Sequence, residues 1–256
     1  MKSLKYIATL LIVVLVLSAC SNNKSLYSDD GQVFRKVITQ DISTLDTALI
    51  SDAVSGDIAG QAFEGLYSID KDDKVTLGVA KEMPKKSNGG KTLTINLRKN
   101  AKWSNGDPVT ADDFVYAWRK VVDPKTASEF AYIMSDIKNA DLVNSGKKPV
   151  SELGIKALDK YKLQVELEKP VPYINELLAL NTFGPQNSKI AKKYGEKYGT
   201  KADRAVYNGP FKVINWQVED KIQLVKNDKY WDKKNVKLDK VNYKVLKDQQ
   251  AGASLY

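Results

Sequence analysis

Few side chains in this sequence could carry catalytic or metal chemistry. It has no histidine, which excludes a His-ligated metal site, a Ser-His or Cys-His nucleophile pair and an imidazole base. Cys20 is the single cysteine, which also excludes an internal disulfide and a CxxC motif. Enzyme chemistry would need carboxylates, lysines or tyrosines, and the absence of a spaced carboxylate pair in a recognisable site disfavours a carboxylate-based hydrolase. We expect no catalytic residue, no metal and no cofactor.

Two short strings partly resemble a phosphate-binding loop and a calcium-binding loop, but neither has all the residues that the motif requires. Gly89-Gly90-Lys91-Thr92 ends like a phosphate loop, but Lys85 stands where a Walker A motif needs its first glycine, and a strand pattern follows. The charged run at 70–74 lacks the glycine and the distal glutamate of an EF-hand loop. We therefore predict a solvated turn at each position.

The single cysteine lies at the end of an N-terminal targeting segment. Two lysines precede an apolar run, Ile7–Val16, and the tetrapeptide L-S-A-C that ends at Cys20 resembles the lipobox of bacterial lipoproteins. The apolar run is too short to span a bilayer comfortably, which favours cleavage over a permanent transmembrane helix. We expect lipid on Cys20 to anchor the protein in the membrane. An ordinary signal peptide with an incidental cysteine is the alternative.

Residues 1–19 are thus predicted to be a lipoprotein signal peptide, and residues 20–32 a lipid-anchored tether rich in Ser, Asn and Asp. We place the protein at the cell membrane, on its extracytoplasmic face.

Composition and charge narrow the class of partner. With 256 residues and 43% hydrophobic content, the chain can bury a real core. Its net charge of +9 comes from 40 Lys and Arg against 31 Asp and Glu, and four of the basic residues are arginine. Lysines alternate with acids along most of the length, which indicates a solvated surface and no nucleic-acid partner. A basic surface would also suit anionic lipid or wall polymer.

The stretch from Ala101 to Ser128 carries the clearest local signals. After the turn residues N-G-D-P, Thr110 is a good N-cap and Asp113 stands in the capping-box position. Apolar residues then recur at helical spacing until Pro124 ends the run: Phe114, Trp118, Val121 and Val122. This pattern predicts a packed strand, turn and helix, but by itself it indicates no particular activity or ligand.

Periodicity predicts the other elements in the same way. Strands are expected at 33–38, 92–97, 161–167, 211–216, 221–225 and 241–245, and helices from near Asp57 to Leu66, at 171–180, at 187–195 and from 249 on. Three residues at a strand exit, Asn227, Tyr230 and Trp231, are expected to be structural rather than ligand contacts, because aromatic residues there usually cover the edge of a core.

As a string, the central stretch resembles a known family. The order K-W-S-N-G-D-P-V-T-A-D-D-F-V-Y-A-W, followed by D-P-K-T-A-S, is similar to the bacterial extracellular solute-binding proteins of family 5, most closely their oligopeptide-binding branch. The resemblance continues in F-E-G-L at 63–66, N-G-P-F at 208–211 and K-N-D-K-Y-W-D at 226–232, so it covers nearly the whole chain.

The resemblance implies a mixed α/β fold, of the α+β kind, with the type II periplasmic-binding-protein-like architecture. Residues 33–66 and 186–256 would form the first lobe, and residues 67–185 a smaller inserted domain. Relatives continue through a second large lobe that closes over the ligand, and this sequence stops in mid-pattern at Tyr256. We therefore expect the first lobe to be truncated and the second lobe to be missing.

The resemblance also implies a ligand site. Ser51, Asp52 and Ala53 correspond to ligand contacts, but these contacts are made by the backbone in the family, so a plain surface loop is an equal alternative. Phe130 stands where oligopeptide binders carry an aromatic residue that faces the ligand, and it could equally be a packing residue.

The function implied by the resemblance is that of the substrate-binding component of an oligopeptide ABC importer. Its partners would be oligopeptides, the permease subunits of the importer and the membrane. Two alternatives remain open. The chain could be a non-binding remnant or surface interaction module of the same family, or a member that binds a non-peptide solute such as a metal chelate.

Overall fold

A computed structural model describes residues 31–247 of the chain. The predicted signal peptide, Cys20 and the predicted helix from residue 249 lie outside the described residues. Within them, the alternating stretches form strands in two four-stranded sheets and one two-stranded sheet, with helices between them. The predicted mixed α/β class is confirmed.

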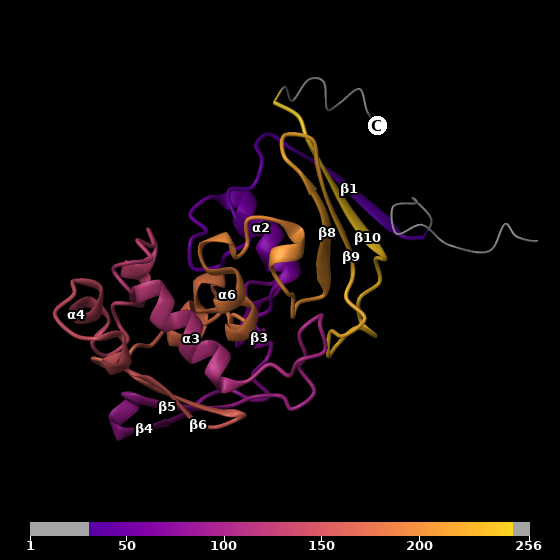
Figure 1. Cartoon of the computed structure of the whole chain (residues 1–256). Coiled ribbons are helices and arrows are strands. Elements are labelled where there is room, and N and C mark those ends of the chain that lie inside the picture. The colour runs from indigo at the N-terminus through magenta and orange to yellow at the C-terminus, as the bar shows by residue number, and fades with distance from the viewer. Residues whose placement is uncertain (1–30, 248–256) are drawn as a thin grey trace, which may run out of the picture. The chain divides into compact units, whose positions relative to one another are not determined.

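The first sheet joins the two ends of the described chain. Strand β1 (Val33–Ile38) lies parallel to β10 (Lys240–Val245), with Val33 opposite Lys240 and Ile38 opposite Val245 (Figure 1). Strands β9 (Lys221–Lys226) and β8 (Phe211–Gln217) follow antiparallel, in the order β1-β10-β9-β8. All four strands were predicted from the sequence.

A hairpin and a second four-stranded sheet lie between these ends. Strands β2 (Tyr67–Ile69) and β3 (Val75–Leu77) pair across the charged turn at 70–74, as predicted. The second sheet has the order β4-β5-β7-β6, formed by β4 (Lys85–Ser87), β5 (Thr92–Asn96), β7 (Lys162–Glu166) and β6 (Ile155–Asp159). Its neighbouring strands are all antiparallel.

Helices connect and cover these sheets (Figure 1). The α-helices are α2 (Ala53–Ala62), α3 (Ala111–Val122), α4 (Ala140–Asn144), α5 (Ile174–Leu177) and α6 (Ser188–Tyr194). Short 3₁₀ turns lie at η1 (Asn88–Gly90), η2 (Ala131–Met134), η3 (Val150–Glu152), η4 (Asn181–Phe183), η5 (Gly195–Lys197) and η6 (Ala202–Arg204).

The central helix α3 begins and ends as its sequence predicts. Thr110 and Asp113 form a capping box, in which the Asp113 carboxylate accepts the Thr110 backbone N–H at 2.9 Å. The same carboxylate accepts the indole N–H of Trp103 at 3.2 Å, which ties the turn before the helix to its first turn. The helix stops at Val122, two residues before Pro124.

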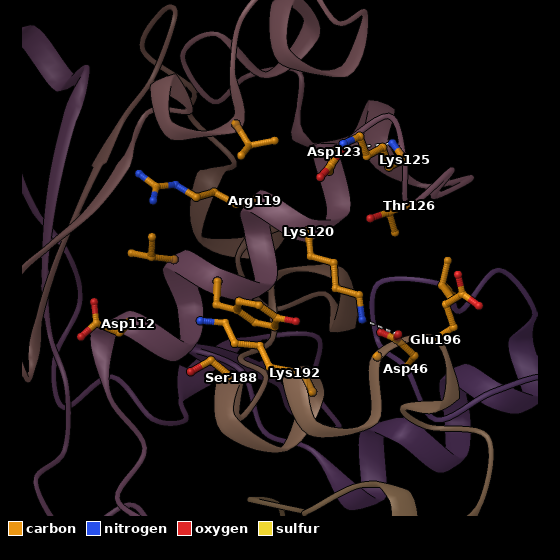
Figure 2. A pocket seen from close by; sticks show the side chains of 16 residues that line it. Asp46, Asp112, Arg119, Lys120, Asp123, Lys125, Thr126, Ser188, Lys192 and Glu196 are labelled. Carbon is orange, nitrogen blue, oxygen red and sulfur yellow. Dashed lines mark hydrogen bonds and ion pairs between the residues drawn. The ribbon is translucent and has the colours of Figure 1, made fainter.

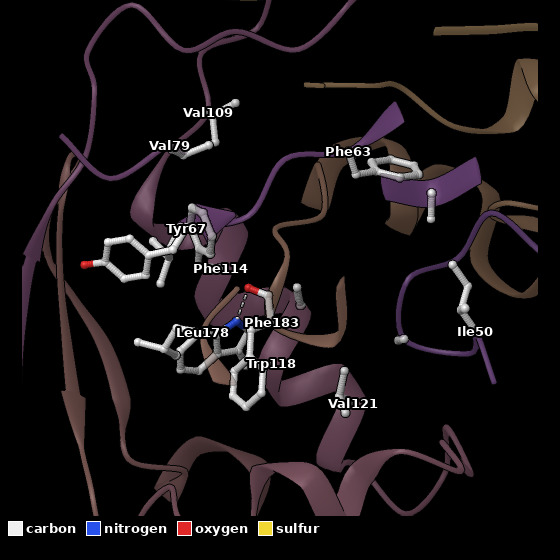
Figure 3. Packing of buried hydrophobic residues seen from close by; sticks show 14 of the residues in the cluster. Ile50, Phe63, Tyr67, Val79, Val109, Phe114, Trp118, Val121, Leu178 and Phe183 are labelled. Carbon is white, nitrogen blue, oxygen red and sulfur yellow. Dashed lines mark hydrogen bonds between the residues drawn. The ribbon is translucent and has the colours of Figure 1, made fainter. Parts of the chain in front are cut away.

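One face of α3 forms part of the main core. Phe114, Trp118, Val121 and Val122 are all buried, as predicted. The Trp118 indole N–H donates to the Phe183 carbonyl oxygen at 2.9 Å, and the Trp118 and Phe183 rings meet edge to face with centroids 5.1 Å apart (Figure 3). The indole is therefore held both by packing and by a satisfied buried hydrogen bond.

Two predicted helices differ from the structure. The helix expected to begin near Asp57 and to reach Leu66 begins at Ala53 and ends at Ala62. Asp52 caps it instead, because its carboxylate reaches the backbone N–H of Ser55. The apolar stretch 171–180 forms only the single turn α5, in which Ile174 is buried, and Leu178, which directly follows the turn, is buried as well.

Residues 32–247 lie in one compact unit. The division of this part into 33–66, 67–185 and 186–256 stays a prediction.

Candidate ligand-binding site

The expected ligand contacts Ser51, Asp52 and Ala53 lie where the chain enters α2. Asp52 has an extended backbone (φ −114°, ψ 151°) and is the N-cap of the helix. Its carboxylate accepts the Ser55 backbone N–H at 2.7 Å, the Ser55 hydroxyl at 2.6 Å and the Ser43 hydroxyl at 2.7 Å. These bonds use the side chain inside the fold and fix the direction of the chain through this segment.

The electrostatics of Asp52 keep this cap formed. Burial by itself raises the pKa of the carboxyl, but the hydrogen bonds from Ser55, Ser43 and Gln40 outweigh burial and lower the pKa below its ordinary value. The carboxylate therefore stays charged at neutral pH and continues to accept these bonds.

The Ser51 backbone is open to an additional partner. Ser51 and Ala53 are exposed, and neither the N–H nor the C=O of Ser51 bonds to another described residue. Exposed peptide groups beside a fixed, extended residue can pair with another extended chain. Ala53 is the first residue of α2 rather than part of a plain loop.

The fourth expected contact, Phe130, lies at a different place in the fold. It is half-buried immediately before η2, and its ring meets Tyr132 edge to face with centroids 6.2 Å apart. Tyr132 is 67% exposed, so the pair presents an aromatic surface. Sequence reasoning missed Tyr132, although its spacing from Phe130 was visible. Within 31–247, no hydrogen bond or ring contact joins Phe130 to residues 51–53.

A groove of about 790 Å³ lies between α3, α6 and the loop that follows β1 (Figure 2). A partly buried ion pair lies at this groove, between Lys120 Nζ and the buried Asp46 Oδ2 at 2.5 Å, and Gln186 donates to the other Asp46 oxygen at 2.7 Å. None of the four expected contacts lines the groove, but Leu49 and Thr126, from the same two segments, do. No sequence pattern indicates that these residues meet at one groove, because they are far apart along the chain.

A buried carboxylate lies where the chain enters β2. Glu64 is 8% exposed, and it accepts the Tyr230 hydroxyl and, at 2.6 Å, the Trp231 indole N–H. Burial raises the pKa of Glu64 to about 7, although the bonds from Tyr230 and Trp231 and the nearby Arg98 charge act to lower it and Asp232 adds to the rise.

The residues around Glu64 have structural roles, as predicted. The Arg98 guanidinium lies over the Trp231 ring, 3.7 Å from its centroid. The buried Asn227 side chain donates to the carbonyl oxygens of Tyr207 and Gly209. Asn227, Tyr230 and Trp231 therefore hold the chain after β9 against the segment that contains Glu64.

Residues 31–247 contain neither a cluster that could hold a metal ion nor a helix that could span a membrane. Between residues 31 and 247, no group of three or more Asp, Glu or Cys side chains is placed to hold a metal ion. Over the same residues, no helix has the length and apolar character needed to cross a membrane.

The chain is similar to known solute-binding proteins. Residues 74–255 match the family model described as bacterial extracellular solute-binding proteins, family 5 Middle. The oligopeptide-binding protein OppA of Bacillus subtilis is 41% identical over 96% of this chain. A solved oligopeptide ABC transporter substrate-binding domain from Bacillus anthracis is 50% identical over 89% of the chain, with a TM-score of 0.86. Listeria monocytogenes OppA bound to peptide is 45% identical over 89%, also with a TM-score of 0.86.

These relatives are longer than the chain. It spans 48% of the Bacillus subtilis protein, and 44% and 45% of the two solved structures. The family model matches well over half of the chain. The two solved relatives share its fold and are 45–50% identical to it in sequence. The chain belongs to the bacterial extracellular solute-binding proteins of family 5.

Proposed function

We propose that this chain forms part of the extracytoplasmic substrate-binding component of an oligopeptide ABC importer. The observation that carries the proposal is the close likeness, over nearly the whole chain, to a relative solved with bound peptide. The open backbone at Ser51 supports it, because peptide groups are what a binder of varied peptide sequences can recognise in common.

In this proposal, an extended peptide pairs with the backbone of residues 51–53. Ser51 supplies an N–H and a C=O that have no partner within the described fold, and the Asp52 cap holds them in place. Recognition through the main chain leaves peptide side chains free to vary, since each hydrogen bond is made to a group that every residue carries.

The ring of Phe130, with that of Tyr132, offers an apolar surface to one side chain of the ligand. Edge-to-face pairing orients the two rings, and the large exposed area of Tyr132 leaves room for contact. Phe130 has no hydroxyl, so this contact would add affinity by burial rather than by a polar bond.

The complete clamp has two lobes in this proposal. Residues 33–66 and 186–256 belong to the first lobe, residues 67–185 form the inserted smaller domain, and a second lobe closes over the peptide by hinge motion. The chain spans about half the length of its relatives. The peptide-binding function is therefore proposed for a two-lobed protein, to which these residues contribute one part.

Lipid on Cys20 would keep the protein at the outer face of the membrane, where it would pass peptides to the permease subunits of the importer. The L-S-A-C string and the basic, apolar segment before it support this part of the proposal.

A matched pair of variants at Ser51 tests the backbone contact. Ser51→Pro removes the N–H, whereas Ser51→Ala removes only the hydroxyl. With ligand-observed NMR and a mixture of tripeptides, Ser51→Ala should bind as the wild type does and Ser51→Pro should bind at least ten-fold more weakly. Unfolding midpoints of both variants serve as the folding control. Equal binding by two folded variants would reject the proposed contact.

A further inference from the structure

The loop that carries Ser51, between β1 and α2, is anchored on both sides of that residue. After Ser51, the Asp52 carboxylate caps α2. Before it, Asp46 closes a turn, because its carbonyl oxygen accepts the Leu49 N–H at 2.8 Å and its carboxylate accepts the Ala48 N–H at 3.1 Å. The direction of the exposed Ser51 backbone therefore depends on Asp46 as well as on the helix cap.

A fully buried amide, Gln186, holds Asp46 in place. Its side-chain nitrogen donates to Asp46 Oδ1 at 2.7 Å and to the Thr47 hydroxyl oxygen at 3.0 Å, and its oxygen accepts from Lys120 Nζ at 3.4 Å. Within the described residues, every hydrogen bond of this side chain thus goes to the loop or to Lys120. A buried amide is costly unless its hydrogen bonds are made, so Gln186 favours one position of the loop.

Lys120 ties the same carboxylate to α3. Its ammonium group lies 2.5 Å from Asp46 Oδ2 (Figure 2), and the two side chains are 20% and 3% exposed. Both oxygens of Asp46 are therefore bonded inside the fold, one to Lys120 and the other to Gln186 and the Ala48 N–H. Loss of Lys120 would leave a buried charge without its counter-charge, which disfavours the present position of Asp46.

The backbone at Gly199 supports the loop from a third direction. Its carbonyl oxygen accepts the Leu45 N–H at 2.8 Å. Gly199 has a φ of 71°, and a Cβ atom at this position would clash with the backbone nitrogen of Asp46. The two backbones approach so closely that only glycine fits, which keeps the base of the loop from moving towards this segment.

We propose that Gln186 and Lys120 are positioning residues for the peptide contact at Ser51, an inference that rests on the proposed function. The two side chains fix Asp46, Asp46 fixes the turn at 46–49, and the turn sets the direction of the Ser51 N–H and C=O. Hydrogen bonds to an extended peptide weaken steeply when distance or angle departs from its optimum. A loop released from Gln186 or Lys120 would therefore present the same peptide groups in a poorer geometry.

A double-mutant cycle in the full chain tests this role, with a mixture of tripeptides as the probe and ligand-observed NMR as the measurement. Gln186→Met removes the amide and nearly keeps the size of the side chain, and it should weaken peptide binding about ten-fold. In the Ser51→Pro background the same substitution should cause no further loss, because the contact that it positions is already gone. Gln164→Met is the matched control, since that side chain bonds to Glu166 in the second sheet, and it should leave binding unchanged.

Lys120→Met carries the same cycle at a partly exposed side chain, so the test does not depend on the folding of Gln186→Met; unfolding midpoints identify the folded variants. Binding that is lost in Ser51→Pro but unchanged in a folded Gln186→Met or Lys120→Met would overturn the inference and leave the proposed contact standing. An equal loss from Gln186→Met in both backgrounds would also overturn it, because the effect would not act through Ser51. Equal binding by Ser51→Pro and wild type, or no binding by wild type, would reject the proposed contact and this inference together.

Discussion

Replacement of Glu64 by glutamine should make the protein more stable at alkaline pH. The Glu64 carboxylate is buried, and the described chain gives it no ion pair, only neutral donors from Tyr230 and Trp231. Glutamine keeps this geometry, because its oxygen can accept the indole N–H and its amide can donate to the Tyr230 oxygen. The variant therefore resembles the protonated form of Glu64 at every pH.

The magnitude follows from the pKa of Glu64. Burial raises it from the ordinary 4.5 to about 7 in the folded chain, and each pKa unit is worth about 1.4 kcal/mol. Protonation of Glu64 thus favours the folded state by up to about 3 kcal/mol. This contribution is fully present below pH 4.5 and is lost as the pH rises through about 7. Above pH 8, Glu64→Gln should exceed the wild type in unfolding free energy by about that amount.

The assay is urea unfolding followed by tryptophan fluorescence at several values between pH 5 and pH 9. The difference in unfolding free energy between variant and wild type isolates the contribution of Glu64 ionisation, because all other titrating groups are common to both proteins. Glu176→Gln, at an exposed position, is the control and should show no such pH-dependent difference. A difference between Glu64→Gln and wild type that stays constant with pH, or a wild type that is the more stable at pH 9, would refute the reasoning.

Three further predictions concern the core, the anchor and the ligand. Trp118→Ala should lower the unfolding free energy by about 3–5 kcal/mol, because it empties a fully buried site and leaves the Phe183 carbonyl oxygen without its donor; a loss below about 1 kcal/mol would contradict this packing. Wild-type protein should partition into detergent and Cys20→Ser should remain an uncleaved precursor, whereas identical processing of the two would reject lipidation of Cys20. A polypeptide of residues 21–256 should bind short peptides more weakly than about micromolar, since a ligand covered on one side keeps much of its water; submicromolar binding by a monomer would show a complete site within these residues.

Much of the fold could be predicted from local sequence. The boundaries of α3 follow from Thr110, Asp113 and Pro124, which act within a few residues of the helix ends. Strands β8, β9 and β10 of the first sheet follow from alternation, because one of their faces is buried. These features depend on short-range chemistry, which the sequence displays directly.

The start of α2 could not be fixed in this way. Asp52 and Asp57 are both acceptable caps in sequence, and the choice between them depends on partners elsewhere. Ser43 bonds to the Asp52 carboxylate, whereas Asp57 pairs with Lys36 of β1 at 2.7 Å. A cap that is supported by a distant residue has no local signature.

The candidate sites were harder still, because their members come from separated segments. The pairs Asp46 with Lys120 and Glu64 with Trp231 bring together residues that no spacing rule connects. Phe130 was found by resemblance, while the exposure of its neighbour Tyr132 and the contact between the two rings are known only from the structure. The groove itself exists only after three elements have packed.

The most direct test of the proposed function is to map peptide contacts onto the chain residue by residue. Isotope-labelled protein would be titrated with tripeptides while the backbone amide resonances are followed by NMR. The proposal predicts that the Ser51 and Ala53 amides shift with added peptide, together with signals from the Phe130 ring. Shifts that are absent at saturating peptide, or that occur only at the groove between α3 and α6, would contradict it.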